Sequence, residues 1–139
     1  MGRAQPDRCL NAINEELEVS VSRTQALMDR YFATMGAEED FSVFFEDDVT
    51  WRWVESGHEV RGAAPVRDYI LALHSRMHGG DQRGLVVADG HALLEGGSVN
   101  AGGGNGPGLA YCLVYDVRDD RISAMRCYGT LARLRSDSD

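Results

Sequence analysis

Hydrophobic residues recur at every third or fourth position in the first third of the chain, which is the period of an amphipathic helix. This pattern predicts a short helix over residues 9–19. It predicts a second helix that begins at Ser22, because Ser22-Arg-Thr-Gln25 matches a capping box, and that ends at Gly36. The aromatic stretch EEDFSVFFEDD then indicates a third, short helix that bears three phenylalanines.

Beyond residue 47 the chain is rich in β-branched and aromatic residues, which is typical of strands. A hairpin is predicted first, over 48–54 and 59–61, with His58 in its turn. One more helix is opened by Gly62-Ala-Ala-Pro65 and stopped at Gly79-Gly80. Long strands are then expected at about 82–89, 91–101, 109–118 and 121–132, with the glycine-rich residues 101–108 as a flexible hairpin loop.

The order of these elements predicts an α+β fold, because the helices lie mainly in the first half of the chain and antiparallel strands fill the second. Residues 1–21 form an N-terminal extension with its own short helix. Residues 22–133 form a single domain, and residues 134–139 form a disordered tail. Neither an internal repeat nor a second domain is visible in the sequence.

Composition narrows the possible partners. The 139 residues carry a net charge of −8, so nucleic acid and anionic membrane surfaces are not expected partners. No apolar run approaches the roughly 20 residues that span a bilayer, and the N-terminus has no apolar region of the kind found in signal peptides. Three cysteines without a CxxC pair suggest reduced thiols, so we expect a cytoplasmic protein.

Four stretches, RYFATM, FFEDDVTWRW, SGHEVRGAAPVRDYI and YDVRDDRISAMRCYG, resemble the nuclear transport factor 2-like superfamily over about residues 22–133. The similarity is greatest to its SnoaL-like polyketide cyclase and ketosteroid isomerase-like branch. This resemblance implies a conical, curved, mixed but mainly antiparallel sheet of the cystatin-like kind. The sheet would wrap around three to four helices, with a pocket inside the cone. It also implies a homodimer and no metal.

The resemblance suggests catalytic positions, residue by residue. Tyr31 stands where steroid isomerases place a tyrosine, but Trp53 stands at the position of their aspartate base, and their second acid falls near Leu113. We therefore name Tyr31 as the candidate donor to a ligand oxygen. His58, at the tip of the hairpin, is the candidate general acid or base. Each also has a plain structural interpretation, Tyr31 as a core tyrosine and His58 as a solvated loop residue.

Trp51 and Trp53 share one face of a predicted strand, because successive side chains point to opposite faces. They are either core filler or the wall of the pocket, and flat aromatic faces suit a planar or polycyclic ligand. The full set of expected ligand-binding residues is Trp51, Trp53, Leu113, Tyr115, Met125 and Cys127. Glu95 or Asp89 would supply the missing base only if its side chain pointed inward.

His74 and His78 are four residues apart on the predicted third long helix, so they would share a face. No third ligand is evident, and we expect neither a metal nor another cofactor. The opposite sheet face, with Cys112, Val114, Arg126 and Tyr128, is assigned to dimer contacts. Whether Cys127 faces Cys112 or Leu113 depends on the length of the last turn.

Three functions stay open at this point. The first is a cofactor-free cyclase, isomerase or dehydratase that acts on a small hydrophobic, polyketide-like or polycyclic metabolite. The second is a non-catalytic protein that binds a hydrophobic aromatic or polycyclic ligand, which the unmatched catalytic carboxylates favour. The third is a dimeric interaction protein whose pocket is only core. An acid or base that reaches the pocket would favour the first function.

Overall fold

A computed structural model describes residues 4–99 and 108–131 of the chain, with the side chains of residues 4–10, 78–81, 98 and 99 left out of the description. The described residues form two α-helices, one short 3-10 helix and six strands. In chain order these are α1 (Ala4–Gly36), η1 (Phe41–Phe44), β1 (Phe45–Trp53), β2 (Glu59–Arg61), α2 (Ala63–Ser75), β3 (His78–Ala88), β4 (His91–Val99), β5 (Leu109–Arg118) and β6 (Arg121–Gly129).

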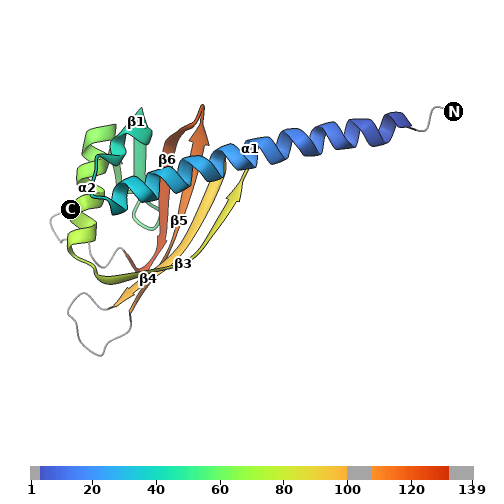
Figure 1. Cartoon of the computed structure of the whole chain (residues 1–139). Coiled ribbons are helices and arrows are strands. Elements are labelled where there is room, and N and C mark those ends of the chain that lie inside the picture. Colours follow the sequence, from blue (N-terminus) through green and yellow to red (C-terminus); the bar gives the residue numbers. More distant parts are fainter. Residues whose placement is uncertain (1–3, 100–107, 132–139) are drawn as a thin grey trace.

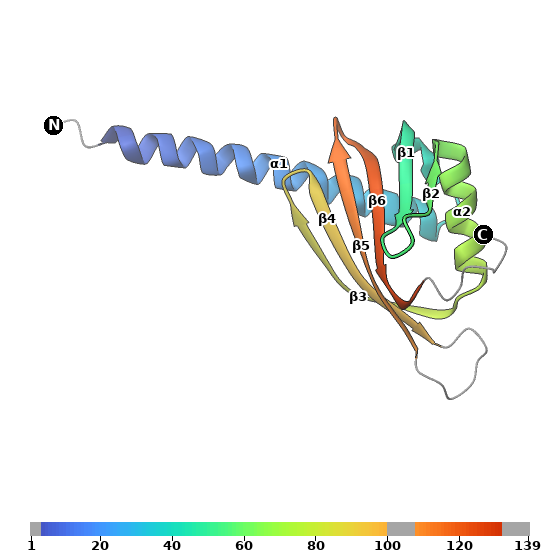
Figure 2. The ribbon, with the colours of Figure 1, turned by 180° about the vertical axis from the view of Figure 1, so that it is seen from behind.

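The six strands form one curved sheet in the order β2-β1-β6-β5-β4-β3 (Figure 1). β1 runs parallel to β6, and every other neighbouring pair is antiparallel. The predicted α+β class and the mixed, mainly antiparallel sheet are therefore confirmed. α1 crosses one face of the sheet. α2 packs against β1 and β2 at one edge of the sheet, as the view from behind also shows (Figure 2).

Fewer α-helices are present among the described residues than the three to four that were expected. Residues 9–19 and 22–36 belong to one continuous helix, α1, and the aromatic stretch forms only the four-residue η1. The predicted capping box does not cap a helix. Instead the Thr24 hydroxyl donates to the Ser20 carbonyl oxygen at 3.1 Å, and the Gln25 side chain bonds Asp29. Both side chains thus make bonds that an uninterrupted helix accommodates.

The first part of α1 extends well beyond the sheet (Figures 1 and 2). Beyond this projecting part, α1 forms hydrogen bonds to the turn between β3 and β4. The Ser20 hydroxyl donates to an Asp89 carboxylate oxygen at 2.6 Å, and the Gly90 backbone N–H donates to the Thr24 hydroxyl at 3.3 Å. Neither α1 nor α2, the two α-helices of the described residues, is both long enough and apolar enough to span a membrane.

The two faces of the sheet differ in polarity. Side chains that point toward the helices form the buried core, including Val49, Trp51, Leu94, Leu113 and Met125. On the opposite, outer face, the Arg126 guanidinium binds the Asp116 carboxylate in two contacts, and His91 Nδ1 lies 3.0 Å from the same carboxylate. The outer face thus holds a polar network that the helices leave uncovered.

The register of the last hairpin answers the question left open for the cysteines. Leu113 lies opposite Cys127, and Cys112 lies opposite Tyr128. Cys127 is therefore buried on the helix side, whereas Cys112 is on the outer face. Burial raises the pKa of the Cys127 thiol to about 12, so this thiol is protonated at neutral pH and is a poor nucleophile.

Candidate functional site

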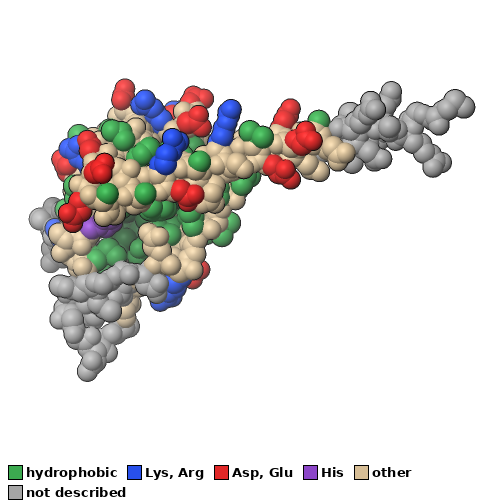
Figure 3. Space-filling view, in the orientation of Figure 1, with side chains coloured by type: hydrophobic (Ala, Val, Ile, Leu, Met, Phe, Trp, Pro, Cys, Tyr) green, Lys and Arg blue, Asp and Glu red, His purple; other side chains and the backbone are tan. Residues whose placement is uncertain are grey.

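A cavity of about 70 Å³ lies between the helices and the sheet. The strands contribute their inward-facing side chains, and α1 and α2 contribute the apolar stripes that face them. The lining residues are Tyr31, Phe32, Met35, Trp51, Ile70, Leu73, His74, Met77, Gln82, Leu94, Tyr111, Leu113, Tyr115 and Leu131. In the space-filling view, a recess with mostly hydrophobic walls lies beneath α1 (Figure 3). The cavity has space for several water molecules or one small ring.

Two buried tyrosines supply hydroxyl groups to this cavity. Tyr31 is 1% exposed and Tyr115 is 2% exposed, with their ring centroids 6.1 Å apart. Burial raises the pKa of Tyr31 well above its usual value. The pKa of Tyr115 is also well raised, by burial first and then by the neighbouring Tyr31. Both groups stay protonated and can donate to a ligand oxygen.

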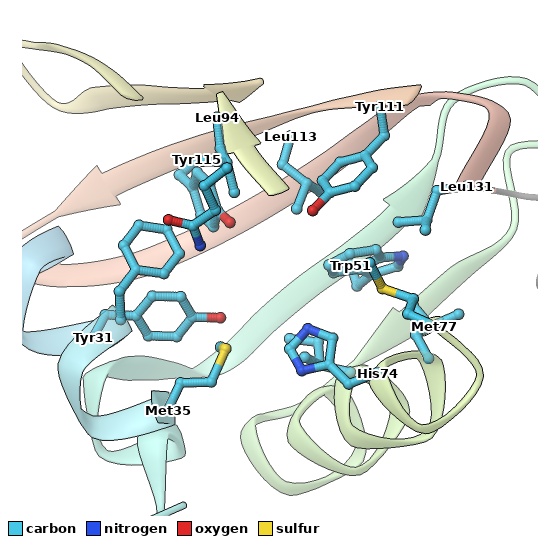
Figure 4. Close-up of a pocket in the computed structure, with 14 residues that line it drawn as sticks. Tyr31, Met35, Trp51, His74, Met77, Leu94, Tyr111, Leu113, Tyr115 and Leu131 are labelled. Carbon is cyan, nitrogen blue, oxygen red and sulfur yellow. The ribbon is translucent and has the colours of Figure 1, made fainter. Parts of the chain in front are cut away.

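A third tyrosine, Tyr111, reaches the cavity because a glycine lies beneath its ring. Tyr111 and Gly96 are opposite each other on β5 and β4. A Cβ atom at Gly96 would lie 2.6 Å from the hydroxyl oxygen and from the ring carbon that bears it, which is too close for any real contact. The missing side chain of Gly96 therefore allows the Tyr111 ring to lie across β4. Figure 4 shows its hydroxyl directed toward the cavity from the β5 side.

His74 supplies the one imidazole among the lining residues. It lies on α2, next to the buried Leu73, and its ring faces the cavity (Figure 4). Its side chain is also exposed to solvent, so it belongs to the rim rather than to the deep wall. Partial removal from water lowers the pKa of His74 below its usual value. The ring is thus neutral at physiological pH and can accept a proton.

The two tryptophans have different surroundings, although both are buried. Trp51 lines the cavity. Trp53 does not; its Nε1 donates to the Tyr69 hydroxyl at 2.6 Å. The two rings meet edge to face, with centroids 5.8 Å apart. Of the two alternatives left open by the sequence, wall or core filler, Trp51 therefore fits the first and Trp53 the second.

Of the eight candidate site residues, four line the cavity: Tyr31, Trp51, Leu113 and Tyr115. The other four are absent from the lining. Trp53, Met125 and Cys127 are buried in the adjacent core. His58 lies in the turn between β1 and β2, where its ring packs 6.2 Å from that of Tyr69.

Neither of the two carboxylates considered as an inward base lies in the cavity. Glu95 is exposed and belongs to the outer face, since its neighbour Leu94 points inward. Asp89 accepts the hydrogen bond from Ser20 at the far turn. No Asp or Glu lines the cavity within the described ranges. Searched over those ranges, the structure also contains no group of three or more His, Cys, Asp or Glu side chains that could hold a metal ion.

The most useful residue that the sequence reasoning placed elsewhere is His74, which was considered only as half of a metal pair. The signal was present, because residues 70, 73, 74 and 77 follow the helical spacing of one face. Tyr111 was also missed, although it alternates with Leu113 and Tyr115 and so must share their face. By contrast, no sequence pattern indicates that Leu131, after the last strand, folds back to the cavity.

The sequence matches no protein-family model and no curated protein. Solved structures are similar in fold. A steroid delta-isomerase from Pseudomonas aeruginosa is 13% identical with a TM-score of 0.69, covering 81% of this chain and 85% of that one. A nuclear transport factor 2-like protein from Burkholderia xenovorans is 16% identical with a TM-score of 0.65, covering 84% and 98%. The chain has the nuclear transport factor 2-like fold.

This nuclear transport factor 2-like fold does not by itself assign an activity. A de novo designed protein with a curved β-sheet is as similar as the natural proteins, at 16% identity and a TM-score of 0.64, covering 81% of this chain and 94% of that one. The same scaffold therefore forms without any inherited chemistry, and function must be argued from the site residues.

Proposed function

We propose that this protein binds a small apolar ligand with an acceptor oxygen inside the cavity between helices and sheet. The observation that carries the proposal is the pair of buried tyrosines, Tyr31 and Tyr115, that line this cavity with their phenol rings. Most of the other lining residues are apolar, so a ligand would gain from both burial and hydrogen bonding.

The size of the cavity restricts the ligand. Sites for drug-sized molecules usually have volumes of about 300–1,000 Å³, whereas this cavity has about 70 Å³. A single ring or a short chain is therefore a better match than a polycyclic molecule, which would need several lining side chains to move. The absence of an acidic lining residue in the described ranges also favours a ligand that accepts hydrogen bonds.

Cyclohexanone is a suitable probe, because it is one small ring with one carbonyl oxygen. Binding should quench the fluorescence of Trp51. Leu113→Phe should fill part of the cavity and so lower the affinity for cyclohexanone at least tenfold. Val114→Phe adds the same ring at the next position, on the outer face, and should leave binding unchanged. Equal binding by both variants, or no binding to the unmodified protein, would contradict the proposal.

A second candidate function is proton transfer of the isomerase or lyase type, and His74 is the observation that favours it. A neutral imidazole at the rim can accept a proton from a carbon next to the ligand carbonyl. The electrons of that C–H bond then form the carbon–carbon double bond of an enolate. The negative charge moves to the carbonyl oxygen, to which the Tyr31 hydroxyl donates. We assign the proton-accepting role to His74 rather than to His58, because only His74 lines the cavity.

This candidate can be tested without the natural substrate. In D2O, the protein should speed the exchange of the α-protons of cyclohexanone, measured by proton NMR. His74→Gln should abolish the added rate, whereas His58→Gln and His91→Gln, which remove imidazoles outside the cavity, should not. If exchange is no faster with the protein than without it although cyclohexanone binds, the protein is a binder and not an enzyme of this type.

A further inference from the structure

One buried donor in the cavity wall has no partner. Trp51 is 3% exposed, and its Nε1 is the single buried side-chain nitrogen or oxygen of the described residues that lacks a hydrogen bond. Leaving a buried donor unpaired is costly, and such groups are rare in folded proteins. An unpaired donor in a cavity wall therefore points to a partner that comes from outside the protein.

The other tryptophan, Trp53, shows that the strand itself does not leave an indole nitrogen unpaired. Trp53 lies two residues further along β1 and on the same face, yet its Nε1 is bonded to the Tyr69 hydroxyl at 2.6 Å. The protein thus satisfies the indole in the core and leaves unsatisfied the indole that lines the cavity. The difference between the two residues coincides with the position of the cavity.

The side chains around the Trp51 nitrogen offer no strong acceptor. In Figure 4 the nitrogen end of the ring lies next to Leu131 and Met77, both of which line the cavity. Leucine has no acceptor atom, and the methionine sulfur is only a weak one. In the same view the Tyr31 hydroxyl points into the cavity from the opposite side. Donors therefore lie on two sides of one apolar space.

We propose that the Trp51 indole N–H is a second ligand donor, and that the ligand is a small ring with acceptor oxygens at both ends. One oxygen accepts from Trp51 Nε1 and the other from the Tyr31 and Tyr115 hydroxyls. Cyclic diones and hydroxylated cyclic ketones have this chemistry. The inference rests on the proposed function, because it names the ligand class of the same cavity.

Three ring compounds of similar shape form a matched series for the test: cyclohexane-1,4-dione with two acceptors, cyclohexanone with one and methylenecyclohexane with none. In the unmodified protein the dione should bind about tenfold more tightly than cyclohexanone, since it satisfies a donor that is otherwise buried and unpaired. Trp51→Phe should reduce this preference to less than twofold. Trp53→Phe, which removes the indole outside the cavity, should retain it.

A direct readout needs no variant. The chain has two tryptophans, so a ¹⁵N-labelled sample gives two indole N–H signals, and Trp53→Phe identifies which signal belongs to Trp51. Saturation with the dione should move the Trp51 indole proton downfield and leave that of Trp53 nearly unchanged, because Trp53 already has a partner.

The outcomes separate this inference from the proposed function. If all three compounds bind with similar affinity and the Trp51 signal does not move, the cavity binds apolar rings and the second donor is disproved. If the dione binds but moves neither indole signal, the Trp51 donor is likewise disproved. If none of the compounds binds, both the inference and the proposed function are wrong.

Discussion

The indole Nε1 of Trp53 donates a hydrogen bond of 2.6 Å to the hydroxyl of Tyr69, which joins the end of β1 to the middle of α2. This bond is part of what holds α2 against the sheet at the cavity boundary. Both rings also approach Trp51, whose centroid lies 5.8 Å from that of Trp53 and 6.3 Å from that of Tyr69. The geometry of the cavity wall thus depends on a contact outside the cavity.

We expect Tyr69→Phe to lower the free energy of unfolding by about 1–3 kcal/mol, because it leaves the buried Trp53 N–H without its partner. Chemical denaturation, followed by circular dichroism, measures the change. A change of less than about 0.5 kcal/mol, as at an ordinary surface site, would show that the bond to Trp53 does not stabilise the fold.

Gly96→Ala should disturb the cavity more than the fold. The added Cβ atom would lie within 3 Å of the outer atoms of the Tyr111 ring, so that ring must move. We expect a loss of about 1–3 kcal/mol of stability, typical of overpacking, and a clear change in cyclohexanone affinity. Gly84→Ala is the matched control, since nothing lies within 4 Å of a Cβ atom there.

A second substitution checks the reason for this effect. If the clash with Tyr111 is the cause, Gly96→Ala should lower the free energy of unfolding less in a protein that already carries Tyr111→Ala than in the unmodified protein. The two changes would then be non-additive, as expected for residues in contact. Additive effects would indicate that Gly96 matters for its backbone rather than for the space above it.

Sequence patterns predicted most of the sheet, because strand alternation and turn residues are local signals. The turns between the strands predicted over 48–54 and 59–61, and over 82–89 and 91–101, are present, and each contains a glycine with positive φ, Gly57 and Gly90. The extent of α1 was not predictable in the same way. The sequence around Ser20 and Ser22 resembles a helix start, and only the contacts of Ser20 with Asp89 and Thr24 with Gly90 show the helix passing through.

The cavity was predictable in part for a related reason. Alternation determines which strand residues face inward, and the inward-facing Trp51, Leu113 and Tyr115 are among the residues that line the cavity. Alternation does not tell which inward residues border empty space, because that depends on how α1 and α2 pack. Met125 and Cys127 share the inward face with the lining residues, yet they lie in solid core.

The Asp116–Arg126 pair on the outer face should make stability depend on pH. The Arg126 guanidinium holds the pKa of Asp116 below its usual 3.8. A carboxylate whose pKa is lower in the folded state contributes stability above its unfolded pKa and loses it as the pH falls through the folded value. Asp116→Asn should therefore cost about 1 kcal/mol at pH 7, a small value because both side chains are partly exposed.

The difference between Asp116→Asn and the unmodified protein should begin to shrink as the pH falls below about 4, the unfolded pKa of an aspartate. It should disappear only below the lower pKa that Asp116 has in the folded protein. Urea denaturation at pH 7, 5 and 3 measures this trend. Asp47→Asn, at an exposed position in β1, serves as the control and should show little effect at pH 7. A cost for Asp116→Asn that is constant across these pH values would mean that geometry, not charge, sets the contribution of Asp116.

The outer face itself predicts self-association. Val86, Leu93 and Tyr128 expose 65%, 41% and 43% of their surface on this side of the sheet, where no helix covers them. Exposed apolar groups that lie on one sheet face are typical of a surface that pairs with another protein, and a homodimer through this face is the simplest arrangement. We expect the protein to sediment as a dimer in analytical ultracentrifugation.

Leu93→Glu should convert that dimer into a folded monomer, because each subunit would then bury an unpaired glutamate in the interface. Ile13→Glu makes the same chemical change at an exposed apolar position on the projecting part of α1. If the outer face is the interface, Ile13→Glu leaves the dimer intact. A monomer in the unmodified protein would show that the outer face is exposed to solvent. A dimer that only Ile13→Glu disrupts would place the interface on α1 instead.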